Sequence, residues 1–244
     1  MIPTQSLIYG IDIKLNKLSG LAHQSIPVEN KIQALNRAQI RLIKKKLSPN
    51  NILGLGFDAS KKRYQDLEVL VENASDHQLP VTLKDPNLNR WSSDLSSPAL
   101  TPNYMFFVDG YLIANKGACT NRVIYINSHL IKHGSVSILL ENPSFVPSFE
   151  YQETFCTLSS DTISVYTDGT FTPTSLYLSY IRYPKYIDYV GYVGFNGNAS
   201  ATVDCELAGY LEEELLDMAV FELGADIEDP AVIQLAGERD KVDE

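Results

Sequence analysis

Hydrophobic residues recur at helical spacing between residues 28 and 47. The positions that define this face lie three, four or seven residues apart: Val28, Ile32, Leu35 and Leu42. Lysine and arginine side chains fall on the opposite face, and Pro27 suits a first helical turn, where no N–H is needed. The pattern predicts an amphipathic helix that ends at the turn residues 48–51.

Two further segments show helical periodicity. The first is residues 58–73, and three cations fall in its first turn: Lys61, Lys62 and Arg63. Cations are unfavourable near a helix N-terminus, so these side chains indicate a contact with a partner. The second segment begins at Asp204, which can cap a helix, and is predicted to end at Gly224.

The middle of the chain shows the alternation and short apolar runs that are typical of β-strands. Strands are predicted over 104–108, 123–126, 136–140, 149–155, 161–166, 176–183, 189–195 and 199–203. Asp168-Gly169 and Asn196-Gly197 are predicted hairpin turns. Prolines and turn residues interrupt residues 78–103, which we expect to form a long connection, either an extended arm or an interface loop.

This order of elements predicts an α+β fold, in which N-terminal and C-terminal helices pack together with a central, mostly antiparallel β region. The expected organisation is a helical segment at 1–77, a β region at 78–203 with the arm at 78–103, and a C-terminal helix with an acidic tail at 204–244. We expect one interleaved structural unit, because the two helical ends share apolar faces.

Charge is distributed unevenly along the 244 residues. The formal net charge of −10 divides into +4 for residues 1–77, −2 for 78–200 and −12 for 201–244. The acidic balance argues against a protein that coats nucleic acid, which needs a dominant basic patch. The acidic end is either a solvated helix and tail, or one of two surfaces that complement each other within or between subunits.

The three cysteines, Cys119, Cys156 and Cys205, are far apart and form no C-x-x-C pair, which suits a reducing compartment. The first twenty residues lack the features of a signal peptide, and no apolar run reaches the length of a membrane span. These observations predict a protein that is made and kept in a cytoplasm.

The search for catalytic motifs is negative. The chain contains no phosphate-binding loop, no nucleophile elbow and no H-E-x-x-H motif. His129 and His133 lack a third ligand at helical spacing, and Cys119 has cations nearby but no identifiable base. Six tyrosines between residues 176 and 192 fit a half-buried sheet, or a protein–protein interface. We therefore expect no enzyme activity, no cofactor and no metal.

Several segments together resemble a known group of proteins. They are IPVENKIQALNRAQIRLIKKKL (26–47), PSFEY (147–151), ISVYTDGTF (163–171), LYLSYIRYPKYIDY (176–189) and DCELAGYLEEELLDMAV (204–220). They resemble virion structural proteins of crAss-like tailed phages that infect Bacteroidetes, in which an L-x-Y-x-R-x-P strand precedes a C-E-L segment and a helix. The resemblance spans most of the chain.

The resemblance implies a ring or adaptor protein of the portal vertex, the head–tail connector, in the virion. Such a ring binds the portal and further ring or tail proteins, follows the twelve-fold portal symmetry and lets DNA pass without sequence-specific binding. A closed ring needs two different patches on each subunit. The expected interface residues are two basic clusters and one acidic cluster: Lys44, Lys45 and Lys46, Lys61, Lys62 and Arg63, and Glu212, Glu213 and Glu214.

Two other functions remain open at this stage. One is a small cytoplasmic α+β enzyme of hydrolase type, whose support is the presence of common nucleophiles. The other is a tail-associated module that binds carbohydrate through exposed tyrosines. A serine or cysteine beside a histidine in a pocket favours the enzyme, and the structure must show which of these side chains meet.

Overall fold

A computed structural model describes residues 1–19, 26–47, 65–96, 100, 103–126, 131–193 and 199–227. The chain divides into two compact units. The helical unit is Met1–Val69 with Pro184–Glu244, and the β unit is Leu70–Tyr183. The predicted segments, with boundaries at residues 77 and 203, were defined by changes in the sequence pattern, whereas the compact units are defined by contacts in the structure. The segment boundaries therefore remain predictions.

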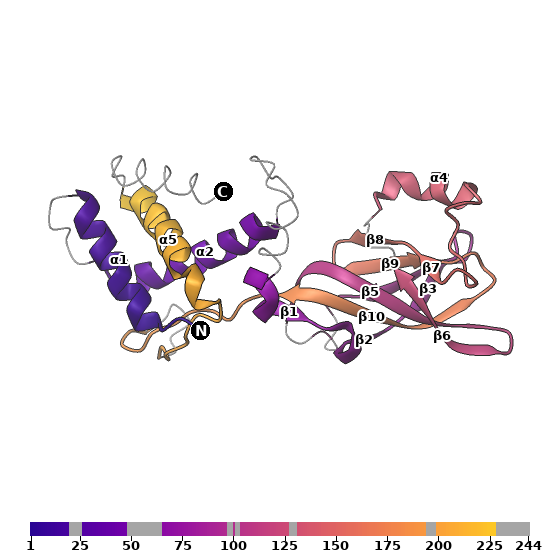
Figure 1. Cartoon of the computed structure of the whole chain (residues 1–244), viewed down its shortest axis with the longest axis horizontal. Helices are drawn as coiled ribbons and strands as arrows, with labels where there is room; N and C mark the ends of the chain where they lie inside the picture. The colour runs from indigo at the N-terminus through magenta and orange to yellow at the C-terminus, as the bar shows by residue number, and fades with distance from the viewer. Residues whose placement is uncertain are drawn as a thin grey trace. The chain divides into compact units, whose positions relative to one another are not determined.

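Among the described residues, the helical unit contains the helices α1 (Thr4–Ser19), α2 (Val28–Leu47) and α5 (Glu212–Ile227) (Figure 1) and helical residues at 65–67. A short 3-10 turn, η4 (Gly209–Leu211), leads into α5. Both α1 and α2 pack against α5 through fully buried aliphatic side chains, which include Leu7, Leu35 and Leu215. The helix predicted at residues 28–47 is confirmed with the same bounds.

The N-terminus pairs with the segment that precedes α5. Ile2 and Cys205 exchange two backbone hydrogen bonds, of 2.9 and 3.1 Å. The Asp204 carboxylate accepts the N–H of Thr4 at 2.9 Å, so it caps α1 rather than the C-terminal helix that we predicted. That helix begins at Glu212 and continues through Gly224 to Ile227, because an apolar helix face outweighs the conformational cost of one glycine.

The segment that follows the β unit lies against α2. The buried Asn36 amide donates to the Ile187 carbonyl at 2.9 Å, and its oxygen accepts the Ile187 N–H at 2.8 Å. The strands expected over 189–195 and 199–203 are represented by the isolated bridges Asp188–Val203 and Val193–Ala199. The Asn196-Gly197 turn lies outside the described residues.

Two sheets form the β unit (Figure 1). The six-stranded sheet has the order β1-β10-β5-β6-β7, and β2 also pairs with β10. Its strands are β1 (Val71–Glu72), β2 (Gln78–Pro80), β5 (Tyr104–Lys116), β6 (Cys119–Ile126), β7 (Glu153–Thr154) and β10 (Thr172–Arg182). The four-stranded sheet contains β3 (Thr82–Asp85), β4 (Arg90–Asp94), β9 (Thr162–Tyr166) and β8 (Cys156–Ser159), in that order.

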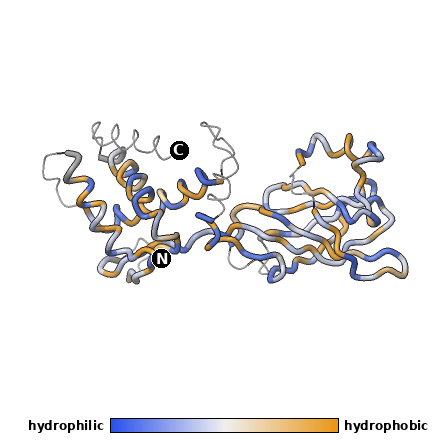
Figure 2. The backbone as a smooth tube through the Cα atoms, in the orientation of Figure 1, coloured by the Kyte–Doolittle hydropathy of each residue, from blue (hydrophilic) through white to orange (hydrophobic). Residues whose placement is uncertain are grey.

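The two sheets enclose the core of the β unit. Alternate side chains of β5 and β10, such as Leu112 and Leu178, meet Ile163 and Val165 of β9 in one buried cluster. Helix α4 (Val136–Glu141) covers the outer face of the four-stranded sheet, where Val136 packs with Phe155 and Tyr166. Figure 2 shows the mixture of hydrophobic and hydrophilic positions along these strands. Short 3-10 turns complete the unit: η1 (Glu68–Leu70) at its boundary, η2 (Ala74–Asp76) and η3 (His133–Ser135).

Some predicted elements differ in the structure. Residues 136–140 form a helix rather than a strand, because Val136, Leu139 and Leu140 lie three and four positions apart and share one face. The expected connection at 78–103 contains β2, β3 and β4. Asp168-Gly169 joins β9 to β10, which belong to different sheets, so this turn makes no hairpin. Of the helix predicted at 58–73, residues 65–67 are helical and are followed by η1 and β1, while residues 58–64 lie outside the described residues.

The α+β fold class is confirmed, since α1 and α2 pack with α5 and the central sheets are mostly antiparallel. Within the described ranges, no helix has the length and apolar character needed to cross a membrane.

Candidate interaction surfaces

The basic end of α2 and the acidic start of α5 meet inside the helical unit. Lys46 Nζ lies 2.7 Å from Glu214 Oε2 and 3.4 Å from Asp66 Oδ2, and Lys45 Nζ lies 3.8 Å from Glu214 Oε1. The Glu214 side chain is only 13% exposed, and that of Asp66 is 1% exposed. Burial and the nearby Asp66 carboxylate raise the pKa of Tyr210. Because a buried carboxylate needs a paired cation, these lysines stabilise the α2–α5 contact.

Helix α1 supplies a second set of contacts to α5. Lys14 Nζ lies 2.7 Å from both Glu213 Oε2 and Asp217 Oδ1, and Ser6 donates to Glu212 at 2.8 Å. The Glu213 side chain is 80% exposed, so its pair with Lys14 adds little to stability.

Arg41 of α2 completes these contacts further along α5. Its guanidinium lies 3.0 Å from Glu222 and 4.8 Å from the ring centre of Phe221. Charged side chains of α1 and α2 are therefore paired with carboxylates of α5 within one chain.

Of the residues predicted to form an interface, the structure brings Lys45, Lys46 and Glu214 together and pairs Glu212 and Glu213 with α1. Lys44 is exposed on the last turn of α2. Lys61, Lys62 and Arg63 lie outside the described residues. The interface role of these nine residues stays a prediction, and five of them also make contacts between helices.

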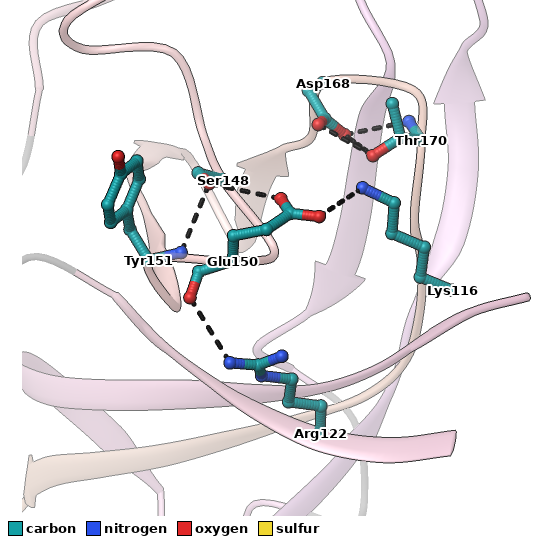
Figure 3. Close-up of polar contacts among 7 residues, drawn as sticks. All are labelled: Lys116, Arg122, Ser148, Glu150, Tyr151, Asp168 and Thr170. Atoms are coloured by element: carbon teal, nitrogen blue, oxygen red, sulfur yellow. Dashed lines mark hydrogen bonds and ion pairs between the residues drawn. The ribbon is translucent and has the colours of Figure 1, made fainter. Parts of the chain in front are cut away.

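A second polar cluster lies on the β unit, where three segments meet (Figure 3). Lys116, at the end of β5, donates to Glu150 Oε1 at 2.7 Å, and Arg122 of β6 donates to the Glu150 carbonyl at 3.2 Å. Both cations also face the ring of buried Phe149, at 5.7 and 5.0 Å. The hydrogen bond from Lys116 lowers the pKa of Glu150. This cluster fixes the loop at residues 147–152 against the β5–β6 hairpin.

Two neighbouring turns complete this cluster. The Ser148 hydroxyl accepts the N–H of Tyr151 at 3.2 Å, and Tyr151 itself is 83% exposed. The Asp168 carboxylate accepts the N–H of Thr170 at 2.8 Å and its hydroxyl at 2.7 Å (Figure 3). Two of the segments that carry the resemblance, 147–151 and 163–171, therefore contribute to one region of the β unit.

The candidate nucleophiles and bases occupy separate places. Cys119 is exposed on β6, whereas Cys156 and Cys205 are buried. Burial raises the pKa of Cys156 to about 12 and also raises that of Cys205. His133 bonds to the Leu158 carbonyl at 2.8 Å, while His77 is buried against Tyr180.

His23 and His129 lie outside the described residues. Among the residues that are described, no group of three His, Cys, Asp or Glu side chains is placed to hold a metal ion.

The six-stranded sheet carries a row of aromatic side chains that the sequence pattern did not predict. Tyr177 of β10, Tyr111 of β5 and Tyr125 of β6 occupy one register row across three adjacent strands. The rings of Tyr111 and Tyr177 stack at 4.9 Å with an interplanar angle of 9°. Residues two positions apart on a strand share a face, so the sequence places Tyr111 with Ile113, and Val123 with Tyr125. The register that aligns these strands is known only from the structure.

No protein-family model matches this chain, and no curated protein matches its sequence.

Proposed function

We propose that this chain is a virion structural protein of a tailed phage, a ring protein that joins the portal vertex to further ring or tail proteins. The resemblance of five segments to the crAss-like phage group carries the proposal. Two of these segments contribute to α2 and α5, and two others meet in the β unit, where the ring centres of Phe149 and Phe171 lie 5.8 Å apart. The segments therefore contribute to the folded core of both units.

The acidic net charge of the chain, −10, fits this role. Lys14, Lys46 and Arg41 neutralise carboxylates of α5, so the chain ends fold together without a partner. An acidic protein surface repels the phosphate backbone, which lets DNA pass through a ring without binding to it. In the proposed assembly, the chain has no catalytic role and requires no cofactor.

The proposal is tested by mixing the purified chain with its cognate portal protein. Electron microscopy and native mass measurement should detect closed rings of this chain stacked on portal particles, with the portal's twelve-fold symmetry. A chain that stays monomeric in the presence of the portal and is absent from purified virions would rule the proposal out.

A further inference from the structure

An open pocket lies on the β unit, where helix α4 and two turns come together. Its volume is about 280 Å³, near the roughly 300 Å³ at the small end of ligand pockets in proteins. One wall is the turn between β3 and β4, at residues 87–89, and a second is α4 with Val146. The third wall is residues 167–168, which follow β9. None of the nine residues predicted to form an interface lines this pocket.

The walls of the pocket are fixed by the fold. Leu140 lines the pocket and also packs against the hydrophobic cluster beneath α4. The N–H of Thr167 donates to the Asn89 carbonyl at 3.2 Å, which joins the two turns. A Cβ on Gly169 would lie 2.9 Å from Asn89 Nδ2, so the Asn89 amide occupies the space that a side chain at position 169 would fill. Because the walls are already ordered, a ligand that binds here loses little affinity to ordering them.

The pocket presents polar side chains that the fold leaves unpaired. Four of them make no hydrogen bond or ion pair within the described ranges: Asn87, Asn89, Ser137 and Glu141. The Asp168 carboxylate accepts hydrogen bonds from the N–H and the hydroxyl of Thr170 and retains further lone pairs (Figure 3). Amides and hydroxyls both donate and accept, whereas carboxylates only accept, so the pocket offers both kinds of hydrogen-bonding partner.

This set of donors and acceptors selects the class of ligand. Among the described residues, two carboxylates and no lysine or arginine line the pocket, so a phosphate or another anion would be repelled. A guanidinium or ammonium group only donates, and it would leave the amide N–H groups without acceptors. A sugar hydroxyl both donates and accepts. The C–H face of a sugar ring can also cover the aliphatic side chains of the wall: Leu88, Leu140 and Val146.

We propose that this pocket binds a neutral sugar, with one ring inside it. The carboxylates of Glu141 and Asp168 accept hydrogen bonds from the sugar hydroxyls, and the amides of Asn87 and Asn89 donate to them. The small volume holds one ring and leaves the rest of an oligosaccharide in solvent. The site adds a binding activity to the proposed structural role and does not depend on ring assembly.

Saturation-transfer difference NMR on the full chain tests this proposal. The probes are the methyl glycosides of glucose, galactose, mannose and N-acetylglucosamine, at concentrations up to tens of millimolar. We expect at least one glycoside to bind with a Kd of about 1–10 mM, since a ligand of about a dozen non-hydrogen atoms makes few contacts. Asn87→Ala and Glu141→Ala should each weaken this binding about fivefold or more, because each variant removes a hydrogen-bonding group from the pocket.

Matched controls alter the same residue types elsewhere on the β unit. Asn73→Ala and Glu153→Ala replace exposed side chains outside the pocket, and both should bind the glycoside as the wild type does. Circular dichroism checks that all four variants fold. The chain is measured without portal protein, so the outcome is independent of the proposed ring function.

The results that would overturn the proposal are equally specific. One is the absence of saturation transfer to every glycoside, and another is equal binding by the pocket variants and their controls. Methylguanidinium chloride serves as the alternative probe. Binding of methylguanidinium but of no glycoside, with loss of that binding in Glu141→Ala, would overturn the sugar assignment and assign the pocket to a basic side chain of a partner protein.

Discussion

The Lys46–Glu214 contact gives the sharpest test of how the two chain ends are held together. The perturbation is Glu214→Gln, which keeps the size of the side chain and removes its charge. In the native unit the carboxylate lies 2.7 Å from Lys46, with the two side chains 13% and 12% exposed. After substitution, Lys46 keeps, among the described residues, the 1% exposed Asp66 at 3.4 Å, and Lys45 loses a carboxylate at 3.8 Å.

The expected cost follows from burial. Removing one member of a buried ion pair costs about 3–5 kcal/mol, because an uncompensated charge remains. Lys46 keeps one carboxylate and some exposure, so we expect about 2 kcal/mol for Glu214→Gln. The matched control is Glu213→Gln, one residue earlier on α5, whose side chain is 80% exposed. An exposed pair contributes about 0–1 kcal/mol, and both glutamates lie in the first turn, where loss of the favourable helix-dipole interaction is similar for the two variants.

Urea unfolding followed by far-ultraviolet circular dichroism measures both variants. With a slope of about 2 kcal/mol per molar urea, Glu214→Gln should lower the midpoint by about 1 M and Glu213→Gln by less than about 0.4 M. A double-mutant cycle with Lys46→Met should give a coupling energy of about 1–3 kcal/mol. Equal, small shifts for both glutamates, with no coupling to Lys46, would refute the interpretation that this buried pair stabilises the α2–α5 contact.

Three further outcomes follow from the structure. A Cβ on Gly110 would lie 2.8 Å from a carbonyl oxygen of β10, so Gly110→Ala should cost about 2 kcal/mol in unfolding free energy, while Gly134→Ala, with open space around it, should be close to neutral. A thiol reagent should label exposed Cys119 rapidly in the native protein and reach the other two cysteines only on unfolding; rapid labelling of all three would contradict their burial. Burial raises the pKa of Cys156 from 9.0 to about 12, so the unfolded thiol ionises first and the stability of the β unit should fall as pH rises from 9 toward 12. Cys156→Ala should flatten this decline, as measured by urea midpoints across that range.

Elements that depend on neighbouring residues were predicted from the sequence, whereas elements that depend on pairing with distant residues were not. Helix α2 was predicted with its observed bounds, because its apolar stripe and proline act locally. Residues 136–140 were predicted as a strand because their apolar run is short, and a run of that length does not distinguish the two structures. Strands β2 and β4 were missed because they pair with β10 and β9, far along the chain, and β3 because it lies at a sheet edge beside β4.

The candidate interaction surfaces also combine features that the sequence predicted with features that required the fold. The complementary charges of the two ends were visible in the sequence, but pairing within one chain required the contact between α2 and α5. The interface role of Lys44 and of residues Lys61–Arg63 remains a prediction. Tyr111 and Tyr125 were not identified, since only strand register brings them beside Tyr177. A surface made by three strands is a property of topology, and hydrophobic pattern alone does not encode it.

We propose that this chain assembles as a ring on a portal vertex. The most direct measurement is electron microscopy of the wild-type chain mixed with cognate portal protein, with symmetry determined from the particle images. We expect closed rings of the chain, coaxial with the portal and matching its twelve-fold symmetry. Portal particles that carry no density for the chain, at concentrations where both proteins are folded, would contradict it.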